Sequence, residues 1–87
     1  MKIRFHKSFF KDLKKLKKKE KQRVKDALRI FEADSCDYQL KNHRLHGVMK
    51  DCRAIWAGGN IRLVFMEKDK YVEVIFLSVG SHDKVYR

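Results

Sequence analysis

The chain has 87 residues, with 22 Lys and Arg against 11 Asp and Glu, and so carries a formal net charge of +11. This length predicts one small domain, 1–87, and argues against two domains built around a large cofactor. The hydrophobic fraction of 44%, which includes six Phe, is enough for a core and argues against disorder. No apolar run approaches the roughly 18–20 residues of a transmembrane helix, and the basic start lacks the apolar stretch of a signal peptide. We therefore expect a cytoplasmic protein that does not contact membranes.

The positive charge is concentrated in the first half of the chain. Residues 1–42 hold 14 Lys and Arg against 6 Asp and Glu, a balance of +8, and the densest block runs from Lys14 to Lys21. Such a basic domain often binds a polyanion, because each phosphate that it neutralises releases counterions. The block indicates nucleic acid or an acidic protein as the partner, or else a solvated helix surface that keeps the chain soluble.

The first half of the chain predicts one strand and two helices. Alternating apolar and basic residues over 1–5 indicate a half-buried strand. Ser8 is a candidate helix cap, and the apolar residues that follow it recur at helical spacing: Phe9, Leu13 and Leu16. A break is expected at Lys17 to Lys19, after which a second stripe continues with Val24, Ala27, Leu28 and Phe31. A connection this short predicts an antiparallel helical hairpin.

The second half predicts three short strands after a loop at 34–42. The strands are expected at 52–56, 61–67 and 71–79, with turns at 58–60 and 68–70, and a short tail from His82 to Arg87 follows. The predicted fold class is α+β: an N-terminal strand, the helical hairpin and a three-strand antiparallel meander, with the helices on one face of the sheet. The opposite face is then left for function.

No motif for a metal, a nucleotide or a catalytic nucleophile stands out. Cys36 and Cys52 are read as reduced thiols, and His43 and His46 with a cysteine match no familiar zinc spacing, so we expect neither metal nor cofactor. The second half does carry many imidazole and cationic groups: His43, Arg44, His46, Lys50, Arg53, Arg62, His82 and Lys84, with Trp56 and Tyr86 among them. Such groups suit metal-independent cleavage of RNA, in which a base activates the 2′-hydroxyl, an acid protonates the leaving oxygen and cations stabilise the phosphoryl charge.

Four segments in this order resemble the RelE/ParE superfamily of toxins from toxin–antitoxin modules, and more closely its RelE/YafQ mRNA interferase branch. They are Ser8 to Leu13, His43-Arg44-Leu45-His46-Gly47, Arg62-Leu63-Val64-Phe65 and Val79 to Tyr86. The resemblance covers essentially all 87 residues. It implies the fold described above, ribosome-dependent cleavage of mRNA in the A site, and neutralisation by a cognate antitoxin protein encoded alongside.

The resemblance also implies roles for four residues. His82 matches the histidine of a G-[ST]-H segment and is the expected general acid, and Arg62 matches an arginine that contacts the scissile phosphate. His43 stands at the position of a functional histidine, and Tyr86 at that of a tail tyrosine or phenylalanine that could stack on a base or help to take a proton. Each role has a structural alternative: His43 could bond only the loop backbone, Arg62 could face solvent on an edge strand, and Tyr86 could simply pack the tail onto the sheet.

The chain departs from the family pattern at three positions, which are Trp56, Asn60 and Ser78. They stand where related chains have a histidine, an aspartate and an arginine. Lys50 and Arg53 are candidates to supply the missing cations, and Lys14, Lys15 and Lys18 are assigned to phosphates of ribosomal RNA. Trp56 and Phe65 are expected to pack rather than to stack on bases.

Two other functions remain open at this point. A ParE-like toxin would have the same fold and would inhibit DNA gyrase instead of cutting RNA. A relative without catalytic activity would keep only its affinity for nucleic acid or antitoxin.

Overall fold

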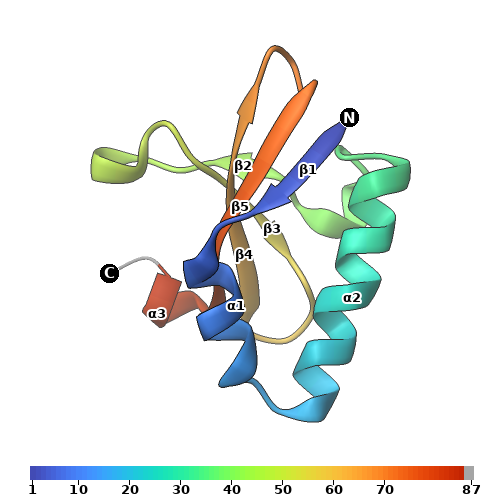
Figure 1. The fold of residues 1–87 in the computed structure, drawn as a ribbon, viewed down its shortest axis with the longest axis vertical. Helices are drawn as coiled ribbons and strands as arrows, with labels where there is room; N and C mark the ends of the chain where they lie inside the picture. The colour runs from blue at the N-terminus through green and yellow to red at the C-terminus, as the bar shows by residue number, and fades with distance from the viewer. Residues whose placement is uncertain (86–87) are drawn as a thin grey trace.

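The computed structural model describes residues 1–85 and contains a five-stranded sheet with two long helices (Figure 1). In chain order its elements are β1 (Lys2–Phe5), α1 (Lys7–Lys14), α2 (Lys18–Ala33), η1 (Tyr38–Leu40), β2 (His43–Arg44), η2 (Gly47–Met49), β3 (Arg53–Trp56), β4 (Ile61–Lys68), β5 (Glu73–Ser81) and α3 (His82–Val85). The strand order is β1-β5-β4-β3-β2. β1 pairs in parallel with β5, and the other neighbours are antiparallel. The predicted α+β class and helical hairpin are confirmed.

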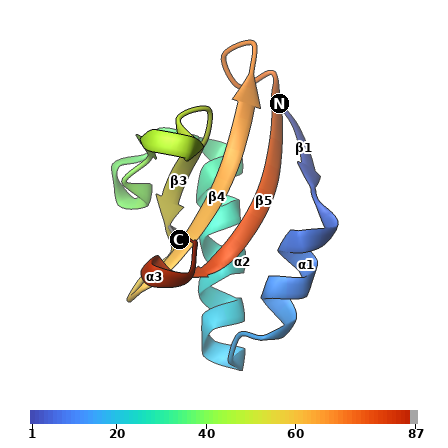
Figure 2. The same cartoon turned by 90° about the vertical axis from the view of Figure 1, so that its left-hand side faces the viewer.

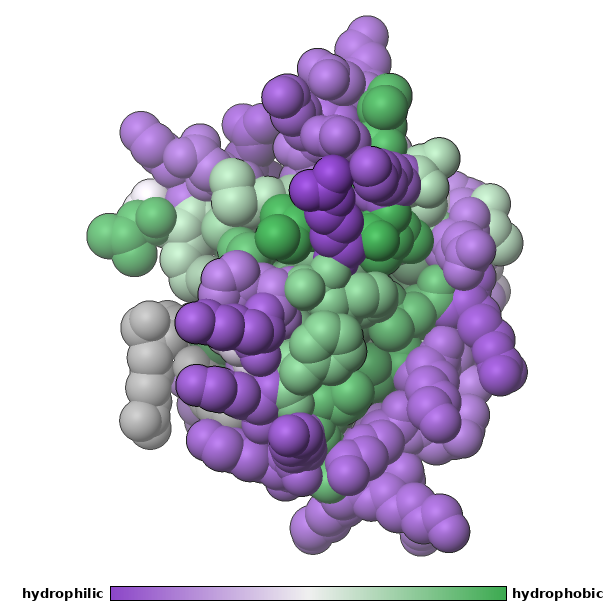
Figure 3. All heavy atoms as spheres, in the orientation of Figure 1, coloured by the Kyte–Doolittle hydropathy of each residue, from purple (hydrophilic) through white to green (hydrophobic). Residues whose placement is uncertain are grey.

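Helices α1 and α2 cover one face of the sheet and run in opposite directions (Figures 1 and 2). The main core lies between them and the strands, and it includes Phe9 from α1 and Val24, Ala27 and Phe31 from α2. Hydrophobic residues also reach the surface in the middle of this side, with hydrophilic residues around them (Figure 3). Within residues 1–85, no helix combines the length and the apolar content needed to cross a membrane.

An aromatic cluster forms the centre of this core around Phe76 of β5. The rings of Phe5, Phe9, Phe31 and Phe65 have their centroids 5.2 to 6.0 Å from that of Phe76. Phe76 is fully buried, so its ring contributes both transfer from water and aromatic contacts. Rings from four elements thereby hold β1, α1, α2 and β4 to β5.

A bulge in β5 is stabilised by two side chains of α1. Val64 pairs with Ser78 and Phe65 with Phe76, so Leu77 has no partner residue on β4. The Ser8 hydroxyl donates to the carbonyl of Leu77, and the Asp12 carboxylate accepts from the backbone N–H of Val79 at 3.2 Å. These bonds replace ladder bonds that the bulge disrupts, which is why Ser8 does not act as the helix cap. His6 caps α1 instead, through Nδ1, which accepts from the N–H of Ser8.

Several element boundaries differ from those expected. The helix break falls at residues 15–17 rather than 17–19, because Glu20 of α2 accepts a hydrogen bond from the N–H of Lys17 and starts the second helix early. Strand β5 continues to Ser81 because Gly80 and Ser81 pair with Arg62 and Ile61 of β4. The expected loop at 34–42 contains the turn η1, and β2 follows it.

The opposite face of the sheet, which we call the open face, carries a small second core. Leu45, Ala54, Val64 and Val85 are buried there against one another. Val85 belongs to α3, so the tail helix lies across the end of β4 and β5 on this face (Figure 2). The prediction that α1 and α2 leave one face uncovered is correct, and α3 occupies part of that face.

Replacing Phe76 with Ala should strongly destabilise the protein. Removing a fully buried ring leaves a cavity among four others and should lower the free energy of unfolding by about 3–5 kcal/mol. Phe10→Ala is the matched control, because the Phe10 side chain is 48% exposed and should cost about 1 kcal/mol or less. Urea unfolding followed by circular dichroism measures both, and equal losses would contradict the role given to Phe76.

Candidate active site on the open face

Arg62 projects from the open face near the start of β4, the central strand of the sheet. It pairs with Trp56 on β3 and with Gly80 on β5. Its side chain lies on the same face as that of Val64, two residues later in β4, and Val64 belongs to the second core on the open face. Its Nη1 lies 3.4 Å from the carbonyl oxygen of Gly59 and 3.2 Å from that of Ile61. The half-buried guanidinium is therefore held beside the β3–β4 turn, where it can meet a phosphate that approaches the sheet.

His82 begins α3 two residues after Gly80. Its backbone N–H donates to the carbonyl of Asn60 at 2.9 Å, so the start of α3 is held next to the β3–β4 turn that precedes Arg62. The imidazole is about half exposed, and its Nδ1 lies 3.7 Å from Oδ1 of Asp83. The sheet register therefore brings two residues that are 20 positions apart in sequence to the same end of the open face.

His43 lies in β2, opposite Ala54 of β3. Ala54 belongs to the second core, so the register places His43 on the open face as well. The Nδ1 atom of the exposed imidazole lies 2.8 Å from the carbonyl oxygen of Lys41. A carbonyl only accepts hydrogen bonds, so Nδ1 carries the proton, and Nε2 of the neutral ring has a free lone pair. The bond to the loop backbone that was considered for His43 is present, and it leaves the ring able to act as a base.

Lys50 and Arg53 line a cavity beside the segment that joins β2 to β3. Its volume is about 730 Å³, and its lining residues are Arg44, Leu45, His46, Gly47, Lys50, Asp51, Cys52, Arg53 and Glu67. Arg53 is half-buried, pairs with the core residue Phe65, and its Nε donates to Oδ1 of Asn42 at 2.8 Å. This bond gives Arg53 a structural partner, whereas Lys50 is exposed.

The remaining predicted residues lie elsewhere. Lys14 ends α1, Lys15 caps it and Lys18 begins α2, so these three exposed lysines surround the hairpin turn in the helix layer. The helix layer and the open face lie on opposite sides of the sheet (Figure 2). The lysines are thus separate from the face with Arg62 and His43. Tyr86 lies outside the described residues.

Trp56 and Lys41 form a feature that the sequence did not indicate. The Lys41 ammonium lies 4.6 Å from the centroid of the Trp56 ring, and the indole N–H donates to the carbonyl of Gly59 at 2.8 Å. Phe65 is fully buried as expected, but Trp56 is only half-buried. Lys41 follows η1 with a positive φ of 49°, and no sequence pattern links it to Trp56, 15 positions later.

The open face thus combines two imidazoles and a guanidinium around a strip of sheet. These groups can move protons and stabilise negative charge, as cleavage of a phosphodiester requires. Within residues 1–85, no group of three or more His, Cys, Asp or Glu side chains is placed to hold a metal ion.

The fold is that of the RelE/YafQ type of toxin. The whole chain, residues 1–87, matches the family model described as the bacterial toxin of type II toxin–antitoxin systems, YafQ. The chain belongs to this YafQ family, which confirms the resemblance seen in the sequence. RelE and YafQ toxins are mRNA interferases.

Three solved structures show the same fold. YafQ from E. coli strain BL21(DE3) is 20% identical with a TM-score of 0.80, and the alignment covers 98% of this chain and 97% of that one. The E. coli DinJ–YafQ toxin–antitoxin complex is 22% identical with a TM-score of 0.74, and the alignment covers 98% of this chain and 96% of that one. The archaeal RelE–RelB complex from Pyrococcus horikoshii OT3 is 19% identical with a TM-score of 0.71, and the alignment covers 92% of each chain. The comparison with curated proteins found no match.

The two cysteines should differ in reactivity. Burial, and secondly the neighbouring Asp51 carboxylate, raise the pKa of the Cys52 thiol above its ordinary value, and Cys36 is exposed. Because the thiolate is the reactive form, iodoacetamide at pH 8 should modify Cys36 about tenfold faster than Cys52. Peptide mass spectrometry over time measures both rates, and the rate at Cys52 should rise as the pH is raised. In urea, where the chain is unfolded, the two cysteines should react at similar rates. Similar rates in the folded protein would contradict the burial of Cys52.

Proposed function

We propose that this protein is a ribosome-dependent endoribonuclease that cleaves mRNA by metal-independent acid–base catalysis. The observation that carries the proposal is the register of the sheet, which puts Arg62 and His43 on one face and starts α3 with His82 beside Arg62. Membership of the YafQ family supports the same activity. A cognate antitoxin is the proposed protein partner, supported by the DinJ–YafQ and RelE–RelB complexes of related toxins.

The proposed reaction is an in-line transfer within the RNA. His43 accepts the proton of a ribose 2′-hydroxyl through Nε2, and the 2′-oxygen forms a bond to the adjacent phosphorus. The bond from phosphorus to the 5′-oxygen breaks, His82 in its protonated form gives a proton to that oxygen, and a 2′,3′-cyclic phosphate remains. Arg62 stabilises the negative charge on the phosphoryl oxygens during the transfer. Tyr86 is proposed to assist, either by stacking on a base or by helping to take the 2′-hydroxyl proton.

Cleavage of a reporter mRNA on programmed ribosomes tests the assignment of His82. His82→Ala should lower the cleavage rate by about 10²–10⁴-fold, because it removes the general acid. His46→Ala is the matched control, since His46 is an exposed imidazole in the β2–η2 loop and should leave the rate within about twofold. Cleavage should also continue in EDTA once the ribosomes are stabilised with a polyamine.

Two results would contradict the proposal. Cleavage at the wild-type rate by His82→Ala would remove His82 from the reaction. No cleavage by the wild-type chain, together with DNA-damage signalling instead of translation arrest on expression, would indicate a gyrase inhibitor.

The lysines of the hairpin turn are proposed to contact phosphates of ribosomal RNA. Charge reversal of Lys14, Lys15 and Lys18 to Glu should weaken ribosome binding and lower the slope of log K against log salt by about 2–3. The matched control reverses Lys2, Lys68 and Lys70, three exposed lysines at the opposite end of the sheet, with the same change in net charge. Sedimentation with ribosomes at several salt concentrations measures both variants. Equal weakening by the two triple variants would show that only net charge matters.

A further inference from the structure

Trp56 and Arg62 form a cross-strand pair on the open face. Trp56 of β3 stands directly opposite Arg62 of β4. The neighbours of Trp56 in sequence, Ile55 and Ala57, belong to the main core, so the indole lies on the opposite face, as the guanidinium does. The carbonyl oxygen of Gly59 holds both side chains, because it accepts from the indole N–H at 2.8 Å and lies 3.4 Å from Nη1 of Arg62. The β3–β4 turn thus fixes an aromatic ring beside the arginine.

Lys41 brings a second cation to this pair. The turn η1 ends at Lys41, whose φ of 49° is uncommon for a residue other than glycine. The Lys41 ammonium lies 4.6 Å from the centroid of the Trp56 ring, which is a cation–π contact. The Cβ atoms of residues directly opposite each other in a sheet are only about 4.5–5.5 Å apart. The Lys41 ammonium and the Arg62 guanidinium therefore lie next to the same indole.

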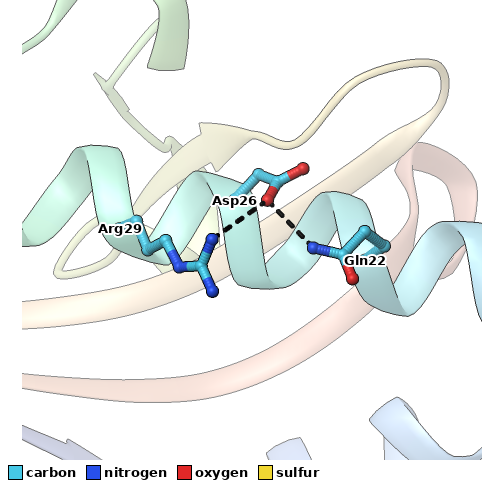
Figure 4. A network of polar contacts seen from close by, with 3 residues as sticks. All are labelled: Gln22, Asp26 and Arg29. Atoms are coloured by element: carbon cyan, nitrogen blue, oxygen red, sulfur yellow. Dashed lines mark hydrogen bonds and ion pairs between the residues drawn. The ribbon is translucent and has the colours of Figure 1, made fainter.

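Neither of these two cations is neutralised by a carboxylate of the described chain. Within residues 1–85, no ion pair involves Lys41 or Arg62. Asp26 of α2 is an acidic residue to consider as a partner, because it lines a cavity between α2, η1 and the β3–β4 turn. Its Oδ1 instead accepts from Nε2 of Gln22 at 3.0 Å and lies 3.9 Å from Nη1 of Arg29 (Figure 4). The two cations next to the indole are thus available to attract an anion.

The backbone of Lys41 connects this cation to the proposed base. The Lys41 carbonyl oxygen lies 2.8 Å from Nδ1 of His43, and this bond leaves Nε2 of the ring free. One residue therefore orders the imidazole through its carbonyl group and places a positive charge at Trp56 through its side chain. The two contributions can be separated by mutation, because every substitution at residue 41 keeps the carbonyl group.

We propose that Lys41 is a substrate-binding residue of the active site, and that its ammonium, held over the Trp56 ring, contacts the RNA phosphate next to the one that Arg62 meets. A lysine loses side-chain freedom when it binds a phosphate, and the cation–π contact confines the ammonium before the RNA arrives. Trp56 is then a positioning residue, since it acts through Lys41. The inference rests on RNA being the ligand of the proposed function, and it does not require cleavage.

Binding of an RNA that cannot be cleaved tests the inference. The probe is a short, dye-labelled single strand whose 2′-fluoro sugars lack the attacking hydroxyl, and its fluorescence anisotropy is measured with the full chain at several salt concentrations. Lys41→Met removes the charge and keeps the length of the side chain, so it should weaken binding about tenfold and lower the slope of log K against log salt by about 0.7. Lys41→Arg should restore most of the affinity. Lys68→Met is the matched control, because Lys68 is an exposed lysine at the far end of β4 and loses the same charge.

A double-mutant cycle tests the role given to Trp56. In a Trp56→Leu background the ammonium has no ring to hold it, so Lys41→Met should weaken binding by only about threefold. In Trp56→Phe, which keeps an aromatic face, the effect of Lys41→Met should return to about tenfold. A ring that only supported the fold would lower every affinity and leave the effect of Lys41→Met unchanged. Equal effects in the three backgrounds would therefore contradict the positioning role.

The outcomes separate this inference from the proposed function. Weaker RNA binding by Lys41→Met, in a protein whose wild type does not cleave mRNA, would refute the proposed function alone. Wild-type affinity and salt slope in Lys41→Met, with mRNA cleavage intact, would overturn the inference alone. Equal weakening by Lys68→Met would show an effect of net charge only and would overturn it too. So would binding of an acidic peptide, but not of RNA, that depends on Lys41, which would make this lysine a contact for protein.

Discussion

Strand β5 lies between β1 and β4, and the ring of Phe76 lies at the centre of the aromatic cluster that joins the two layers. The order of the sheet depends on this pairing, because β5 is the strand to which β1 is bonded. Helix α1 also packs on β5, where Ser8 and Asp12 satisfy backbone groups at the bulge. The tail helix then begins where β5 ends.

The candidate site follows from these backbone constraints. Arg62 faces away from the helices because its neighbours Ile61 and Leu63 face the main core, and strand residues alternate. His82 is placed by the last pairs of β5 with β4 and by its bond to Asn60. Val85 then anchors α3 on the second core. The hydrogen-bonded pairing of β4 with β5 thus sets the positions of Arg62 and His82 relative to each other.

Sequence periodicity predicted the elements that bury a regular stripe. The stripe from Val24 to Phe31 and the alternation after the Gly58–Gly59 turn are sufficient to locate α2 and β4. The two-residue strand β2 and the bulge at Leu77 could not be predicted, because each depends on a tertiary partner. The cap by His6 is local, but histidine is not a typical cap residue, and Ser8, the expected cap, bonds Leu77 instead. The site divides in the same way. Arg62, His43 and His82 came from family motifs, whereas the contact of Lys41 with Trp56 joins a turn to a distant strand edge and leaves no local signal.

The parallel pairing of β1 with β5 has a consequence for synthesis. Lys2 pairs with Glu73, so β1 has no neighbouring strand until β5 has been made. The aromatic cluster is likewise incomplete before Phe76 emerges. Such pairing between distant segments also slows folding, because the entropy cost of bringing β1 and β5 together comes before any gain from their contacts. The first two elements of this fold, β1 and α1, are therefore joined to the sheet only once β5 has been synthesised.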